Sequence, residues 1–165
     1  MHKFSEFTLV LSVVVVFVVV LGLVFNFQSI DREINRWKLL AQTSSDTAEI
    51  YNSLSKVEEG LVRWGMTEGY SGIFKTQEND MSLKVTQLQL IKTKAERLSM
   101  TPSNTSEYNT NLNLLQEDLK TLDLKTKSYW NVHVGMGWWL VGAFFLYTGL
   151  AALAFWNKDH SSFKQ

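Results

Sequence analysis

The chain of 165 residues contains no cysteine. This absence excludes disulfides, c-type haem attachment, iron–sulfur ligation and thiol chemistry. An excess of charge of one sign is also missing, because 16 Lys and Arg residues balance 16 Asp and Glu residues. Without a global field of either sign, the sequence gives no reason to expect nucleic acid as a partner.

Motifs for catalysis are missing as well. The glycines between residues 60 and 72 do not match the phosphate-binding pattern Gly-x-Gly-x-x-Gly. Glu58 and Glu59 are adjacent and so point about 100° apart on a helix, which prevents them from forming a carboxylate pair by themselves. The chain has neither a Glu-x-x-His pair nor an acidic metal loop. The sequence therefore predicts a protein that is not an enzyme and needs no cofactor or metal.

Two long apolar runs dominate what is present. Phe7 to Phe25 and Val134 to Trp156 contain no charged residue. At a rise of about 1.5 Å per residue, each run can cross a bilayer core of about 30 Å as a helix. The first run is longer than a signal-peptide core and lacks a small-x-small cleavage site, which favours an uncleaved anchor. We expect transmembrane helices at residues 7–26 and 134–156, with short cytoplasmic tails at residues 1–6 and 157–165.

Between the two runs lies a hydrophilic segment, residues 27–133. Its apolar residues recur at spacings of mainly four and three, which is the periodicity of a helix. These residues are Ile30, Ile34, Trp37 and Ala41; Ile50, Leu54, Val57, Leu61 and Trp64; Met81, Val85, Leu88, Ile91, Ala95 and Leu98; and Tyr108, Leu112, Leu115, Leu119, Leu122 and Tyr129. Pro102 marks a turn, and Ser106 is the expected N-cap of the last helix. The expected fold is all-α, with two transmembrane helices flanking an extracytoplasmic antiparallel helical bundle.

A cluster of four glycines interrupts this periodicity at residues 60, 65, 69 and 72. Each glycine weakens a helix by about 1 kcal/mol relative to alanine. One interpretation is a kinked helix or a membrane-distal turn. The other is a surface on which a partner or a small ligand approaches the backbone closely. The candidate residues of that surface are Glu59, Arg63, Trp64, Gly69 and Tyr70.

A family pattern lies in the same region. Glu59, Arg63 and Gly69, followed by Ile73 and Phe74, share the register of Glu-x-x-x-Arg-Gly-Tyr-x-x-x-Gly-x-x-x-aromatic-Leu. This register resembles the third class of CHASE sensor domains, although the two residues after Arg63 differ from the family's Gly-Tyr. The resemblance implies an extracytoplasmic helical bundle between two transmembrane helices of a bacterial receptor.

The resemblance also bears on orientation and signalling. Charge alone leaves the orientation open, because the positive-inside rule weakens for loops longer than about 60 residues. The resemblance implies that both tails are cytoplasmic, which corresponds to a bacterial inner membrane protein with residues 27–133 outside. Members of the family continue into kinase, cyclase or methyl-accepting modules, whereas only residues 157–165 follow the second run here. A sensor of this kind would act through a separate partner.

Small residues form a stripe on the second apolar run. Gly135, Gly142 and Gly149 recur every seven residues, and Ala152 extends the same face. Such a face lets another helix backbone approach closely, which is a main source of association in lipid. The approaching helix is either that of a partner or the first apolar run of the same chain. The stripe leaves both alternatives open.

His133, at the mouth of the second run, is the candidate for a cofactor ligand. A lone imidazole near a bilayer surface can bind haem iron or the magnesium of a chlorin. Because no second histidine lies at helical spacing, the sequence favours an ordinary interfacial histidine.

The sequence therefore predicts a non-catalytic accessory, scaffolding or regulatory subunit of a larger integral membrane complex. Its partners would be integral membrane subunits and the lipid bilayer, and a homo-oligomer is a further option. The alternative is an extracytoplasmic sensor that binds a small ligand and signals through a separate kinase or receptor.

Overall fold

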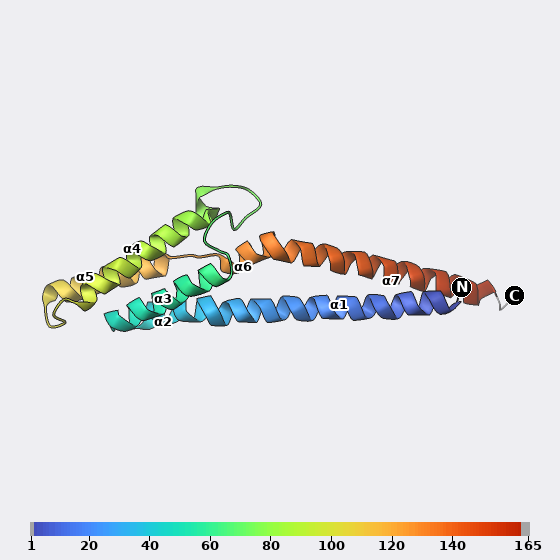
Figure 1. The fold of residues 1–165 in the computed structure, drawn as a ribbon, viewed down its shortest axis with the longest axis horizontal. Helices are drawn as coiled ribbons and strands as arrows, with labels where there is room; N and C mark the ends of the chain where they lie inside the picture. Colours follow the sequence, from blue (N-terminus) through green and yellow to red (C-terminus); the bar gives the residue numbers. More distant parts are fainter. Residues whose placement is uncertain (1, 163–165) are drawn as a thin grey trace. The chain divides into compact units, whose positions relative to one another are not determined.

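The computed structural model describes residues 2–162, with side chains for residues 7–154. Residues 1 and 163–165, at the ends of the two expected tails, lie outside the described residues. Within the described part, regular structure is helical apart from one isolated antiparallel bridge between Tyr70 and Asp80 (Figure 1). This confirms the all-α expectation. The chain divides into an apolar unit, residues 1–26 and 133–165, and a polar unit, residues 27–132.

The apolar unit consists mainly of two long helices, α1 (His2–Ile30) and α7 (Met136–Ser162). Both helices are long and apolar enough to cross a membrane. Of their most apolar stretches, 17% and 6% of the residues are buried, so neither helix is enclosed as the core helix of a soluble domain would be. Exposed apolar surface of this extent is typical of a membrane or protein interface.

The polar unit begins with the end of α1. A π-helical turn, η1 (Asp31–Asn35), joins α1 to α2 (Arg36–Thr43). Ile30, Ile34 and Ala41 are fully buried, which confirms that a buried stripe continues outward from the first apolar run.

Five further helical segments complete the unit. They are α3 (Thr47–Arg63), the 3₁₀ turn η2 (Gln77–Asn79), α4 (Met81–Ser99), α5 (Ser106–Thr121) and α6 (Thr126–Trp130), with a second π-helical turn, η3 (Asn131–Gly135), directly after α6. Helix α3 packs against α2 and α4, and α5 packs against α4 and α2. The four helices therefore surround a common core.

That core is formed by the predicted stripes. Its fully or nearly fully buried members include Ile50, Leu54, Val57, Leu61, Met81, Leu88, Ile91, Ala95, Leu98, Leu115, Leu119 and Leu122. Each stripe faces inward because residues three and four apart share one side of a helix. Burying each Val, Leu, Ile or Met side chain among them stabilises the fold by about 1.5–3 kcal/mol.

Polar side chains define the starts of the helices. The carboxylates of Asp46 and Asp80 accept hydrogen bonds from the backbone N–H groups of Ala48 and Ser82, at 2.9 Å in both cases. The expectation for α5 was wrong by one residue, because Thr105 accepts from the N–H of Tyr108 at 3.1 Å and Ser106 is already helical. An N-cap needs an extended backbone, and Thr105 has it, with φ −102° and ψ 149°.

One partly buried ion pair links α3 to α4. The Lys92 ammonium and the Gln89 amide both donate to the Glu58 carboxylate. These hydrogen bonds, that of Lys92 first, lower the pKa of Glu58, and the bond to Glu58 raises the pKa of Lys92. The pair is therefore stabilised in its charged form.

Replacing Glu58 tests this pair. Glu58→Gln should lower the melting temperature at neutral pH, because it removes an interaction of about 1 kcal/mol. The pKa of Glu58 is lower in the folded chain than its value of 4.5 in the unfolded chain. The carboxylate therefore contributes its full stabilisation of the fold above pH 4.5, and this contribution is lost as the pH falls through the pKa of the folded chain. The difference between wild type and variant should therefore shrink below about pH 4.5. Thermal melts followed by circular dichroism on the detergent-solubilised chain measure this difference in melting temperature. A difference that does not change with pH would contradict the charged pair of Glu58 and Lys92.

Candidate functional site

Two members of the small-residue stripe, Gly142 and Gly149 of α7, face α1 within the apolar unit. A Cβ atom placed on Gly149 would lie 3.0 Å from Ser12 Cβ, and one on Gly142 would lie 3.4 Å from Val19 Cγ1. The hydroxyls of Ser12 and Thr148 are 3.4 Å apart. This geometry supports the alternative in which the glycines accommodate the first helix of the same chain. Gly135 is buried and Ala152 is half-buried.

A groove runs beside this seam. It has a volume of about 400 Å³. Its lining is apolar apart from Ser12 and comes from α1 and α7: Leu9, Ser12, Val13, Val16, Phe17, Val20, Phe145, Leu146, Gly149, Leu150 and Leu153. In hydrocarbon, a groove of this chemistry would be filled by an acyl chain or by an apolar helix.

A different face of α7 is exposed. Leu140, Phe144 and Tyr147 are 72%, 62% and 74% exposed, at spacings of four and three residues. At about 100° per residue, this stripe lies roughly opposite the face of Gly142 and Gly149. The exposed stripe was not singled out in the sequence, because periodicity alone does not tell which side of an apolar helix is covered.

The glycine cluster of the polar unit forms a turn rather than a kinked helix. Helix α3 ends at Arg63, and Gly65 follows with φ +64°. The N–H of Met66 donates to the carbonyl of Leu61 at 2.8 Å, and that of Gly65 donates to Val62 at 3.1 Å. These two bonds are a Schellman C-cap, in which the positive φ favours glycine.

This turn also contacts the segment that leads into α7. The Tyr129 hydroxyl on α6 donates to the carbonyl of Gly65 at 3.0 Å. Burial, followed by the charge of Glu68, raises the pKa of Tyr129. The turn therefore lies at the end of the polar unit where the chain leaves it.

Glu33 connects two of the predicted surface residues. The Arg63 guanidinium and the Trp64 indole N–H both donate to the Glu33 carboxylate, at 3.1 and 3.2 Å. Glu59, one turn earlier on α3, instead pairs with Lys56 at 2.9 Å. No pattern in the sequence indicates Glu33 as the partner of Arg63 and Trp64, because Glu33 lies 30 residues before Arg63. Arg63 is largely exposed, so its pair with Glu33 contributes little stability.

The other two predicted residues begin a loop, residues 69–80, which we call the tip loop. Gly69 has φ +87°, and its carbonyl accepts from the N–H of Met81 at 2.9 Å. Tyr70 forms the bridge with Asp80, and the Lys75 ammonium lies 5.5 Å from the centre of its ring. The structure therefore divides the predicted surface in two, with Arg63 and Trp64 on Glu33 and with Gly69 and Tyr70 in the tip loop.

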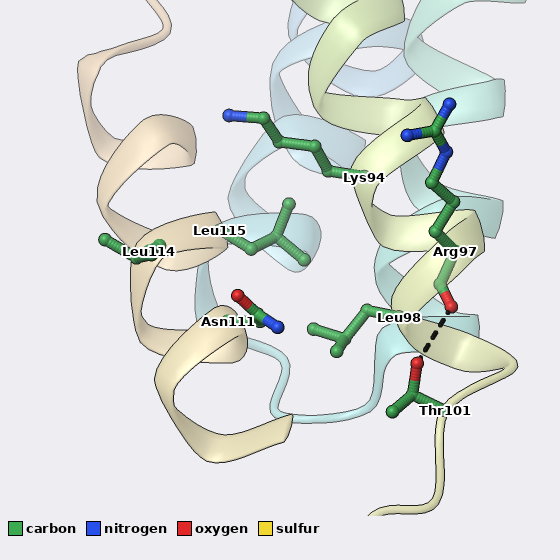
Figure 2. Close-up of a pocket in the computed structure, with 7 residues that line it drawn as sticks. All are labelled: Lys94, Arg97, Leu98, Thr101, Asn111, Leu114 and Leu115. Carbon is green, nitrogen blue, oxygen red and sulfur yellow. Dashed lines mark hydrogen bonds between the residues drawn. The ribbon is translucent and has the colours of Figure 1, made fainter. Parts of the chain in front are cut away.

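A small pocket between α4 and α5 provides a further candidate site. It measures about 260 Å³ and is lined by Lys94, Arg97, Leu98, Thr101, Asn111, Leu114 and Leu115. Figure 2 shows Leu98 and Leu115 facing each other across it, with Lys94 extending from α4 towards α5. The Lys94 ammonium also donates to Asp118 at 2.6 Å, so its charge is already compensated. The site offers an apolar floor with a polar edge.

His133 lies in η3 with an exposed side chain. Among the described residues, no three His, Asp or Glu side chains are grouped in a way that would hold a metal ion. Its role as a ligand stays a prediction.

Comparison with family models, with curated proteins and with solved structures gives no match for this chain. The resemblance to CHASE sensor domains therefore rests on the sequence register alone and stays a prediction.

The seam between α1 and α7 predicts a specific cross-link. Because the chain has no cysteine, Ser12→Cys with Thr148→Cys introduces one pair, which should form an intramolecular disulfide on mild oxidation. Adding Gly149→Leu should lower the yield severalfold, since its side chain would overlap Ser12. Gly137→Leu is the matched control, because a Cβ there meets nothing within 4 Å. Non-reducing gel mobility separates the outcomes, and a cross-link between two copies would show instead that the stripe pairs chains.

Proposed function

We propose that this chain is a non-catalytic accessory, scaffolding or regulatory subunit of a larger integral membrane complex. In this proposal α1 and α7 cross the bilayer, and the exposed stripe of Leu140, Phe144 and Tyr147 contacts a partner helix. The polar unit supplies a second contact outside the bilayer. The observation that carries the proposal is the position of Tyr147.

Tyr147 places a phenolic hydroxyl close to the middle of an apolar span. The run from residue 134 to residue 156 is centred on Phe145, so Tyr147 is displaced along the helix by only about 3 Å. Its side chain is 74% exposed, and its hydroxyl makes no hydrogen bond within the described part of the chain. In hydrocarbon a hydroxyl without a partner is costly, and a neighbouring helix is the usual source of an acceptor.

The position of the glycine seam supports the same conclusion. Gly142 and Gly149 are already occupied by α1 of the same chain, which leaves the opposite face for a partner. The adjoining Leu140 and Phe144 give that face large apolar side chains, as a packed helix interface needs. Docking through α7 is thus retained, with a different set of residues from the small-residue stripe.

We further propose that the polar unit is extracytoplasmic in a bacterial inner membrane and that both ends of the chain are cytoplasmic. This orientation is supported by the resemblance to CHASE sensor domains. Lys and Arg residues near the two runs are more numerous in the polar unit than in the tails, which taken alone favours the reverse orientation. That rule weakens for loops longer than about 60 residues, because long domains translocate largely regardless of their charge.

A second candidate function is a sensor that signals through a separate kinase or receptor. The pocket between α4 and α5 favours it, because Lys94 and Asn111 lie at the edge of an apolar floor formed by Leu98 and Leu115. A pocket of about 260 Å³ suits a small organic ligand.

Co-purification in mild detergent tests the accessory role. The tagged wild-type chain should recover a stoichiometric set of membrane subunits, identified by mass spectrometry. Leu140→Ala, Phe144→Ala and Tyr147→Ala together should abolish that recovery. Tyr147→Phe alone should weaken it by about fivefold, which corresponds to one hydrogen bond of about 1 kcal/mol in a membrane.

The matched control places the same number of alanines on the exposed side of α1, as Val14→Ala, Leu21→Ala and Phe25→Ala. These changes should leave the recovery unchanged. Equal losses in both triple variants would argue against a specific face of α7. Recovery of the chain alone would favour the sensor, provided that a small ligand raises its melting temperature and that Lys94→Ala removes this effect.

The orientation predicts which residues reagents reach in intact cells. Met100 is 77% exposed and lies at the far end of α4. In the cysteine-free chain, Met100→Cys should react with a membrane-impermeant maleimide after permeabilisation of the outer membrane only. Reaction that requires disruption of the inner membrane would place the polar unit in the cytoplasm and reverse the topology.

A further inference from the structure

The tip loop carries two large apolar side chains at its outer end. Ile73 is 73% exposed, and Phe74, at 81%, is the most exposed large apolar residue among the described side chains. No residue of the polar unit covers them. Two adjacent exposed apolar residues of this size are typical of a surface that binds a membrane or another protein.

The loop that holds them is fixed rather than free. The N–H of Ser71 donates to the carbonyl of Asn79 at 2.7 Å, and the Asn79 amide donates to the carbonyl of Phe74 at 3.3 Å. A Cβ on Gly72 would lie 2.6 Å from the Asn79 amide nitrogen, so the loop closes tightly around that side chain. The two apolar side chains are therefore held on the surface by a turn with its own hydrogen bonds.

The anchors of the loop place it at one particular end of the polar unit. The Lys125 ammonium, next to α6, donates to the Asn79 side chain at 3.3 Å, and Tyr129 holds the carbonyl of Gly65 just before the loop. Tyr129 lies three residues before Val132, the last residue of the unit. At the same end Trp64 bonds to Glu33, which lies six residues after the unit begins at Phe27.

Both apolar helices are joined to the polar unit at this end. The rings of Phe27 and Trp130 are in edge contact, with centroids 5.2 Å apart, so the entry and the exit of the chain lie side by side. If α1 and α7 cross a bilayer, as in the proposed function on which this inference rests, covalent continuity brings this end of the polar unit to the bilayer surface.

We propose that Ile73 and Phe74 insert into the boundary between the headgroups and the acyl chains of that bilayer. The occupant of the exposed loop end is thus lipid, not a second protein. Aromatic and aliphatic side chains suit the depth just below the headgroups, and Lys75, which follows directly, suits the headgroup level. Glu78 and Asp80 in the same loop outnumber this one positive charge, so the apolar side chains rather than the charge carry the proposal. The tip loop would act as a third membrane contact, in addition to the two spans.

Depth-dependent quenching tests the inference in the full chain. A single Thr76→Cys substitution carries an environment-sensitive fluorophore and leaves both apolar side chains in place. The protein is reconstituted alone into vesicles of phosphatidylcholine and phosphatidylglycerol with nitroxides at the headgroup, in the upper acyl chain or near the bilayer centre. We expect strong quenching by the first two probes and weak quenching by the third.

Two control chains define the scale. Met100→Cys is similarly exposed, but it follows the C-terminus of the 19-residue α4, about 28 Å from the end held by the tip loop, and should not be quenched. Phe17→Cys lies within α1 and should be quenched by the central probe. In a third chain, Thr76→Cys is combined with Ile73→Ser and Phe74→Ser. The quenching of the fluorophore at position 76 should then fall severalfold. The fold should persist, because both replaced side chains are exposed.

The controls also separate the two proposals. If Phe17→Cys is quenched while Thr76→Cys behaves like Met100→Cys, the spans stand and the loop insertion is wrong. If Phe17→Cys is not quenched, the proposed spans fail first and the insertion with them. A blue-shifted Thr76→Cys probe without lipid quenching would show that protein covers the loop, which also overturns the inference.

Discussion

The close approach of α3 to the π-helical turn η1 is the constraint on which the polar unit depends. A Cβ on Gly60 would lie 2.7 Å from both the backbone oxygen of Glu33 and Cγ1 of Ile34, so a larger residue would push the two segments apart. With glycine there, Ile34 is fully buried, and Arg63 and Trp64 reach the Glu33 carboxylate. The contact thus holds the C-terminal end of α3 against η1.

Glycine is used in two physically different ways along the chain. At Gly60, Gly142 and Gly149 the missing side chain lets another segment approach, which is a matter of volume. At Gly65 and Gly69 the backbone has positive φ, which is a matter of conformation. In sequence these two uses look alike. Structure separates them, because a Cβ on Gly60 or Gly149 would meet a close neighbour, whereas Gly65 has a positive φ and nothing within 4 Å of such an atom.

The buried stripes and the two apolar helices were predictable from the sequence, since spacing along a helix determines which residues share a face. The partners of special residues were not. Glu33 lies 30 residues from Arg63, and whether Gly149 faces α1 or another protein depends on tertiary packing. The N-cap of α5 was missed by one position because Thr105 and Ser106 have the same capping chemistry and differ only in backbone conformation.

The two π-helical turns have a consequence for how this chain can change over evolution. Each turn contains one more residue per hydrogen-bonded loop than an α-helix does, so losing a single residue there would restore a regular helix and leave its neighbours helical. The second turn, residues 131–135, spans the boundary between the two units, whereas the first, residues 31–35, begins four residues after the polar unit starts at Phe27. Losing one residue from 131–135 would therefore leave α6 and α7 as one regular helix, whereas losing one from 31–35 would also move Ile34, which is buried against Gly60.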